Sequence, residues 1–207
     1  MRCLVPVATN SPKSRLAPVL SPAERRTFAR AMLLDVLSTL VAADCQPTVL
    51  ATDSIDDDQI TNRATIAVDD RPLTPAINAR LAEGEPTLIV MADLPLIEPQ
   101  DIIQLTDSDA DVTVAPGLGG GTNALAIHDP SFRVDYHGAS YLDHCRAADE
   151  VGASVETVDS RRLATDIDEP TDLAAILIPG DGAAAEWLTA AGFELDTTGG
   201  RVGVVRE

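Results

Sequence analysis

Lysine is almost absent from this chain: among its fifteen Lys and Arg residues, Lys13 is the only lysine. Thirty-three acidic residues outnumber these cations and give a net charge of −18. This balance argues against a nucleic-acid-binding protein, because contacts with a phosphate backbone need a positive surface. Self-repulsion of this size opposes a compact state unless salt screens it. We therefore expect a halophilic protein that folds fully only in molar salt; an acidic mesophilic protein is the alternative.

Aromatic residues and cysteines are also scarce. Aromatics make up 3% of the chain against 45% hydrophobic residues, so the core must consist mainly of Ala, Val, Leu and Ile. The three cysteines, Cys3, Cys45 and Cys145, lie far apart and show no metal-binding spacing. They are typical of reduced, structural thiols.

Long apolar runs are missing as well. No stretch reaches the roughly eighteen residues of a membrane helix, and the amino terminus lacks the basic-then-apolar pattern of a secretory signal. We expect a cytoplasmic protein that has neither a membrane partner nor a nucleic-acid partner.

The pattern of apolar residues predicts strands alternating with helices, which is typical of a three-layer α/β sandwich with a mostly parallel mixed sheet. The expected strands are 3–8, 47–52, 65–68, 87–92, 111–115, 123–127 and 154–158. The expected helices are 22–43, 75–83, 99–106, 140–151, a segment from 173 to about 179, and 182–191, with a hairpin at 194–205. Closely spaced strands on either side of a glycine-rich loop suggest a local antiparallel insertion. At 207 residues the chain is expected to form one domain, with 181–207 as a C-terminal extension.

The first strand leads into the chain's only lysine. Turn-forming residues 9–12 follow the strand, and Lys13 and Arg15 come before the first long helix, which Ser21, Pro22 and Glu24 should cap. A loop of backbone N–H groups and cations after a strand is suited to holding a polyphosphate. It is not a Walker loop, because the glycines and the Gly-Lys-Ser/Thr ending are missing. Ordinary surface cations are the alternative.

Two aspartates are candidate magnesium ligands. Asp93 ends the apolar strand 87–92, and Asp168 precedes a helix near the end of the chain. Ligands of open α/β sheets gather outside the carboxyl ends of the strands, and magnesium takes one or two carboxylates together with phosphate oxygens and water. The alternatives are a turn-forming role for Asp93 and a helix-capping role for Asp168.

A third feature is the loop Gly117-Leu-Gly-Gly-Gly-Thr-Asn123. Its glycines allow a ligand to approach the backbone closely, and Thr122 and Asn123 add polar side chains. A mobile hairpin loop is an equal alternative. Thr52, Asn78 and Ser140 are weaker candidates.

Other chemistries are disfavoured. A Gly-x-Ser-x-Gly elbow and clustered Cys and His residues are both missing, which argues against a serine hydrolase and a zinc site. Of the three histidines, His137 is expected near the site, and His128 and His144 are expected to be structural.

The order of these motifs resembles the 2-phospho-L-lactate guanylyltransferases of coenzyme F-420 biosynthesis, of haloarchaeal type. The resemblance covers Val5 to about Ala175. It rests on segments at 13–21, 24–25, 31–37, 92–95, 119–125, 138–144 and 166–173. It implies the fold of the GT-A, nucleotide-diphospho-sugar transferase group, with a single nucleotidyltransferase domain over 1–207. It also suggests a homodimer. It also implies transfer of GMP from GTP to 2-phospholactate, with magnesium bound and pyrophosphate released.

The resemblance also implies roles for individual residues, which fall into four groups. Lys13 and Arg15 would hold the GTP phosphates, Asp93 and Asp168 would bind magnesium, Thr122, Ser140 and the backbone of Gly119, Gly120 and Gly121 would hold the phospho-acid, and Asn78 and the Thr52 region would contact the nucleoside. Since the nucleophile is already a phosphate, no activated Ser or Cys is needed.

Two departures and several alternatives remain. Family members often carry a lysine where this chain has Ala8, and their Gly-Leu-Asn segment reads Ala76-Ile77-Asn78 here. Phosphoenolpyruvate is an alternative acceptor. A molybdenum-cofactor or sugar-phosphate nucleotidyltransferase on the same fold, or a non-catalytic nucleotide-binding protein, is the alternative function.

Overall fold

The computed structural model describes residues 1–10, 12–200 and 202–206. Its main sheet has seven strands in the order β3-β2-β1-β4-β6-β5-β7. Their bounds are β1 Arg2–Val7, β2 Pro47–Ala51, β3 Thr65–Val68, β4 Thr87–Val90, β5 Val112–Pro116, β6 Thr122–Ile127 and β7 Val155–Thr157. Only β6 runs antiparallel to its neighbours, β4 and β5, and the other pairs are parallel. The predicted antiparallel insertion is therefore confirmed.

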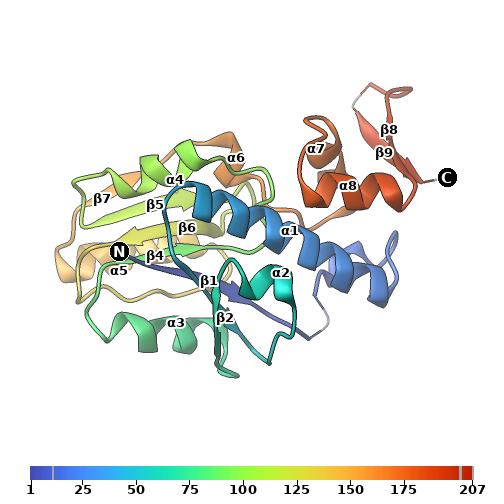
Figure 1. The fold of residues 1–207 in the computed structure, drawn as a ribbon. Helices are drawn as coiled ribbons and strands as arrows, with labels where there is room; N and C mark the ends of the chain where they lie inside the picture. The colour runs from blue at the N-terminus through green and yellow to red at the C-terminus, as the bar shows by residue number, and fades with distance from the viewer. Residues whose placement is uncertain (11, 201, 207) are drawn as a thin grey trace.

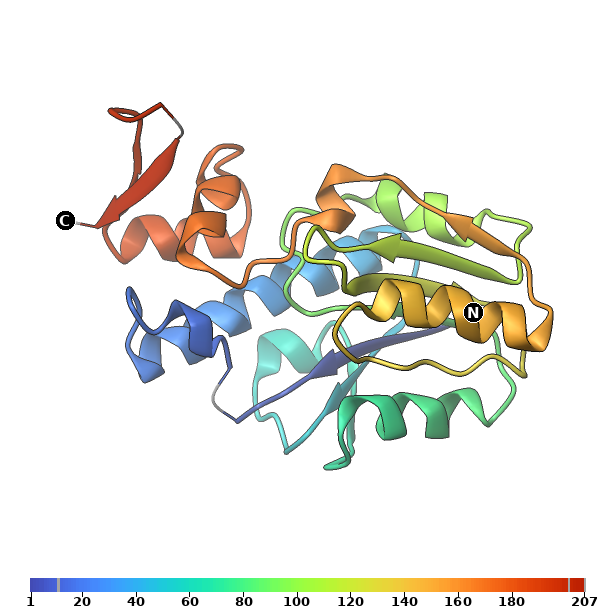
Figure 2. The same cartoon turned by 180° about the vertical axis from the view of Figure 1, so that it is seen from behind.

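Helices cover both faces of this sheet. Their bounds are α1 Pro22–Ala42, α2 Asp58–Thr61, α3 Leu73–Leu81, α4 Pro99–Thr106, α5 Ser140–Val151 and α6 Arg161–Ala164, with a 3-10 turn at Ser14–Leu16. Buried residues of α1, α2, α4 and α6 pack against one face, and those of α3 and α5 pack against the other (Figures 1 and 2). The structure is thus the predicted α/β three-layer sandwich with a mostly parallel mixed sheet.

The C-terminal segment forms a lobe beside α1 (Figure 1). A 3-10 turn at Pro170–Asp172 leads into α7 Leu173–Leu177 and α8 Ala183–Ala190, and a two-stranded sheet joins β8 Phe193–Asp196 to β9 Gly203–Arg206. Phe28 and Met32 of α1 and Leu188 of α8 belong to one buried cluster. The lobe is therefore held to α1 by an apolar core that is separate from the two cores on the faces of the sheet.

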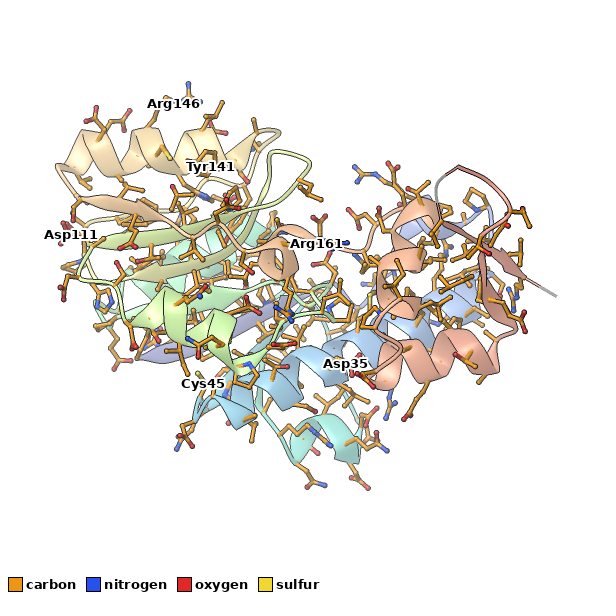
Figure 3. All side chains as sticks on the ribbon, turned by 90° about the horizontal axis from the view of Figure 1, so that it is seen from above. Asp35, Cys45, Asp111, Tyr141, Arg146 and Arg161 are labelled. Carbon is orange, nitrogen blue, oxygen red and sulfur yellow. The ribbon has the colours of Figure 1, made fainter. Side chains whose placement is uncertain are left out.

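Asp35 ties α1 to the start of α8 (Figure 3). Its carboxylate accepts hydrogen bonds from the backbone N–H groups of Ala183, at 2.6 Å, and Ala184, at 2.8 Å. A Cβ at Gly182 would lie 2.8 Å from the Asp35 carboxylate, and Gly182 has φ +92°, so glycine suits this position on both grounds. Asp35 thus caps a helix that lies about 150 residues further along the chain.

Local sequence signals placed most elements within two residues. The capping box of Ser21 and Glu24 is present at the start of α1, and α4 and α5 have their predicted bounds. The four-residue helices α2 and α6 were not predicted, because one turn is too short to show a helical period. Within the described residues, no helix is both long and apolar enough to span a membrane.

Candidate active site

The candidate site lies where the order of the strands reverses. The chain builds β2 and β3 on one side of β1 and then continues with β4 on the other side. Loops that leave the carboxyl ends of β1 and β4 therefore diverge around a crevice, which is where α/β sheets bind ligands. A cavity of about 540 Å³ opens at this point, lined by both loops, by α1, by the segment after β2 and by Asp168.

Lys13 bridges the two predicted metal-binding aspartates. Its Nζ donates to Asp93 Oδ2 at 2.5 Å and to Asp168 Oδ1 at 2.7 Å. Arg15 Nη1 donates to the other oxygen of Asp168, at 3.0 Å. The four charged groups that sequence reasoning selected for this end of the site are therefore brought together. Lys13 has the left-handed backbone conformation, φ 53° and ψ 49°, which is uncommon for a residue with a side chain.

Backbone contacts explain how residues so far apart in sequence meet. The N–H of Ile167 donates to the carbonyl of Asp93 at 3.1 Å, which places Asp168 beside the end of β4. Asp172 then fixes the turn, because its Oδ2 accepts from the N–H groups of Asp168, at 3.0 Å, and Glu169, at 2.7 Å. The capping role weighed for Asp168 thus belongs to Glu169 and Asp172, which form a capping box. This leaves the Asp168 side chain facing Lys13.

Charge pairing and burial raise the pKa values of Lys13 and Asp166. Burial tends to lower the pKa of Lys13, but the carboxylates of Asp93 and Asp168 outweigh it, so the net shift is upward. Lys13 is therefore charged throughout the neutral range. Burial raises the pKa of the neighbouring Asp166, and the charges of Asp93 and Asp168 act in the same direction.

The carboxylates fit a magnesium ion by their chemistry. Asp93 and Asp168 offer hard oxygen atoms, and both side chains are partly exposed to the cavity, at 26% and 35%. In the part of the chain that the structure describes, no group of three or more His, Cys, Asp or Glu residues is arranged to hold a metal. Two carboxylates with phosphate and water oxygens match the way in which magnesium is commonly bound.

The glycine-rich loop lies beside this cavity, at the start of β6. The N–H of Met91, at the end of β4, donates to the carbonyl of Asn123 at 3.0 Å. A Cβ at Gly117 would lie 2.8 Å from the Asn123 side chain, so only glycine fits there. The Asn123 amide also donates to Leu163 O at 2.8 Å and to Asp166 Oδ1 at 3.1 Å. Asn123 thus fastens the glycine loop to the segment that carries the second aspartate.

The predicted phospho-acid ligands Thr122 and Ser140 converge near this loop. Both are buried, at 4% exposure each. Gly121 faces Ser140, because a Cβ there would lie 4.0 Å from Ser140 Oγ, and the N–H of Tyr141 donates to Gly120 O at 3.4 Å. The structure therefore brings the start of α5 next to the glycine loop.

The two expected nucleoside contacts lie outside the cavity lining. Thr52 contacts a residue of the lining but does not line the cavity itself. The N–H of Thr9, which lines the cavity, donates to Thr52 Oγ1 at 3.0 Å. The amide of Asn78 bonds both the carbonyl and the N–H of Val134, each at 2.9 Å. A direct contact of Asn78 with a nucleoside would require this amide to give up those two bonds.

The far end of the cavity contains charged residues that sequence reasoning did not select. Arg30 of α1 and Asp57 at the start of α2 line it and form a two-pronged ion pair. Asp57 also caps α2, accepting from Gln59 N at 3.0 Å. Nothing local in the acidic run at 56–58 indicates that Asp57 pairs with α1; only the folded chain shows this contact.

His144, expected from the sequence to be structural, is buried beside the predicted ligand Thr122. It is 1% exposed, and its Nδ1 lies 2.9 Å from Thr122 Oγ1. Burial lowers its pKa to about 4. His137, the histidine expected near the site, is exposed, and its Nδ1 contacts the carboxylate of Asp135. A sequence spacing of twenty-two residues gives no sign of the contact between His144 and Thr122.

Comparison with known proteins gives close relatives over the whole chain. The 2-phospho-L-lactate guanylyltransferase of Halorubrum lacusprofundi is 54% identical, with 100% of each chain covered. That of Haloarcula marismortui is also 54% identical, over 100% of this chain and 99% of the relative. The corresponding protein of Methanoregula boonei is 43% identical, over 98% and 94%.

Solved structures support the fold at much lower identity. A putative nucleotide-diphospho-sugar transferase from Desulfovibrio desulfuricans matches with a TM-score of 0.75 at 13% identity, over 92% of this chain and 95% of that one. A nucleotidyl transferase from Methanothermobacter matches with a TM-score of 0.58 at 12% identity, over 91% and 98%. The predicted nucleotidyltransferase-like fold is thereby confirmed.

The family model described as "Guanylyl transferase CofC like" matches residues 1–206. Its match includes the C-terminal lobe as well as the sheet. With the relatives above, it shows that the chain belongs to the CofC-like guanylyl transferase family.

Proposed function

We propose that this protein transfers GMP from GTP to the phosphate of 2-phospho-L-lactate and releases pyrophosphate. The observation that carries the proposal is the contact of Lys13 with both Asp93 and Asp168 at the switch point of the sheet. Membership of the guanylyl transferase family and the names of the relatives support the reaction and its substrates.

The chemistry demands positioning more than activation. An oxygen of the acceptor phosphate attacks the α-phosphorus of GTP, a new P–O bond forms, and the bond from the α-phosphorus to the bridging oxygen of pyrophosphate breaks. Neither the nucleophile nor the leaving group needs a proton, because both are oxyanions at neutral pH. The protein must therefore hold several negative charges close together and in line.

In this proposal the loop after β1 carries the cations for the triphosphate. Lys13 is charged and almost buried, with 10% of its side chain exposed, so its position is well defined before substrate binds. Arg15 is 66% exposed and is free to turn toward phosphate. When the triphosphate binds, both cations exchange part of their contact with Asp168 for phosphate oxygens.

Asp93 and Asp168 are proposed to hold a magnesium ion. When bound, magnesium would neutralise charge on the reacting phosphates. The nucleoside is proposed to extend from these residues into the 540 Å³ cavity between α1 and the segment after β2. The phospho-acid is proposed to bind at Thr122, Ser140 and the backbone of Gly119–Gly121.

A pyrophosphate-release assay tests this function. The protein is incubated in molar KCl with magnesium and GTP, and with 2-phospholactate, phosphoenolpyruvate or no acceptor. Release only with 2-phospholactate is the expected result, and release only with phosphoenolpyruvate would change the proposed acceptor. The variant Asp93→Asn should lose turnover while keeping its circular-dichroism spectrum. Full activity of that variant would remove Asp93 from the metal site.

The homodimer and the cytoplasmic location suggested by the sequence are further proposals. Light scattering during gel filtration in molar KCl tests the first. A mass of one chain, 21.8 kDa, would contradict it.

A further inference from the structure

The imidazole of His144, on α5, is buried between Thr122 at the start of β6 and two aromatic rings. Its Nδ1 lies 2.9 Å from Thr122 Oγ1, and both residues are buried. The ring of Tyr136 meets the His144 ring edge-on, with centroids 4.9 Å apart, and Phe132 lies 6.1 Å away. The plane of the imidazole is therefore fixed by two aromatic neighbours, and its Nδ1 points at one hydroxyl group.

The aromatic neighbours are themselves anchored from α3. Asn78 makes two hydrogen bonds to the backbone of Val134, and Thr74 Oγ1 accepts from the N–H of Tyr136 at 3.0 Å. This accounts for the role of Asn78 in the structure. It fixes the segment that places Tyr136 against His144. It does so from α3, which packs on the sheet face opposite to that of α1, the helix that lines the cavity.

We propose that His144 is a positioning residue for the acceptor phospho-acid: by donating from Nδ1 to Thr122 Oγ1, it leaves the Thr122 proton free to point at the anion. This inference rests on the proposed function, because it assumes that Thr122 binds the acceptor. His144 makes no contact with substrate in this proposal and acts only through Thr122.

The direction of the hydrogen bond follows from the number of protons available. A threonine hydroxyl has one proton, so it can donate to an anion only if its contact with His144 is one in which it accepts. The histidine is neutral near pH 7, because burial lowers its pKa to about 4, and so it carries a single N–H. The Nε2 of His144 is buried and has no partner among the described residues. An orphaned buried N–H is rare, so the proton is better placed on Nδ1, where Thr122 accepts it.

The direction of the hydrogen bond between His144 and Thr122 matters because the acceptor substrate is an anion. If Thr122 donated to His144 instead, it would present lone pairs to the phospho-acid and repel it. One hydrogen bond to a charged ligand changes affinity by about tenfold. The expected consequence of losing His144 is therefore a higher KM for the phospho-acid, while the KM for GTP, which binds at the Lys13 side, stays the same.

The test compares four changes at this contact. His144→Phe removes the donor. His144→Asn keeps one, because its amide reaches the place of Nδ1. Thr122→Val removes the hydroxyl, and the double variant carries His144→Phe with Thr122→Val. KM and kcat are measured for 2-phospholactate and for GTP by pyrophosphate release in molar KCl.

We expect His144→Phe to raise the KM for 2-phospholactate about tenfold and to change the KM for GTP less than twofold. His144→Asn should recover most of the loss, and the double variant should match Thr122→Val alone. An unchanged KM for 2-phospholactate, equal increases in both KM values, or additive effects in the double variant would each overturn the proposal.

Two safeguards keep the result interpretable. If His144→Phe does not fold, His144→Gln replaces it, because its longer amide reaches the place of Nε2 and misses Thr122. If the unmodified protein itself releases no pyrophosphate with any phospho-acid, the proposed function fails, and with it the assumption on which this inference rests. Activity in the unmodified protein with normal KM values in the His144 variants would refute this inference alone.

Discussion

Burial of His144 should make the folded protein sensitive to mild acid. Its pKa is lowered from 6.5 to about 4 by burial, with Asp135 and Asp143 as the charged neighbours that oppose the shift. Between these two values the unfolded chain binds a proton that the folded chain does not. The contribution of His144 to stability is therefore complete above pH 6.5 and is lost as the pH falls toward 4.

The size of this effect follows from the two pKa values. From pH 7 to pH 5, an unfolded histidine of pKa 6.5 becomes almost fully protonated, while a folded one of pKa about 4 stays mostly neutral. The difference corresponds to about 2 kcal/mol of unfolding free energy. The variant His144→Asn cannot titrate in this range, and it keeps a donor for Thr122.

Urea unfolding of both proteins at pH 7 and pH 5, in molar KCl, measures this quantity. The carboxylates titrate in both proteins, so their contribution cancels when the two pH effects are subtracted. The unmodified protein should lose about 2 kcal/mol more than His144→Asn between the two pH values. Equal losses would refute the reasoning, because they would show that His144 is protonated in the folded state near its ordinary pKa.

Three further predictions concern the site, the C-terminal lobe and the charge of the chain. Lys13→Gln should lower turnover about a hundredfold or more. In calorimetry it should bind Mn²⁺ at least as tightly as the unmodified protein, because a competing cation is gone. Asp168→Asn should lose both turnover and Mn²⁺ binding, and weaker metal binding by Lys13→Gln would contradict this arrangement. Asp35→Ala should lower the unfolding free energy by about 1 to 2 kcal/mol, because the cap of α8 is lost. Asp149→Ala removes an exposed aspartate and should change the unfolding free energy little. Equal effects of the two substitutions would argue against the cap. Transfer from molar KCl to low salt should unfold the protein, as judged by circular dichroism, since its net charge is −18; full folding in low salt would refute the halophilic interpretation.

The sequence predicted best what depends on local chemistry. The capping box at Ser21, the helix at 140–151 and the antiparallel insertion all follow from residues close together in the chain. Asp93 and Asp168 could be selected because strand ends in this class of sheet share one edge. That general rule, together with the rarity of lysine, was enough to nominate the central charged group.

Contacts between distant segments could not be predicted in the same way. No local pattern shows that the N–H of Ile167 bonds Asp93, that Asp35 caps α8, or that His144 meets Thr122. Each depends on how segments that are distant in the sequence pack against one another in the folded chain. Asn78 illustrates the limit, since the resemblance assigned it to the nucleoside and its amide is bonded to the backbone of Val134.

The nature of the bond that is formed tests the central claim most directly. Phosphorus NMR of the reaction in molar KCl, with magnesium, GTP and 2-phospholactate, distinguishes a new diphosphate bridge from simple hydrolysis. The account predicts equal amounts of pyrophosphate and of a diphosphate diester joining guanosine to lactate, both dependent on the acceptor. Formation of GMP without a diester, or no reaction by folded protein with any phospho-acid, would contradict it.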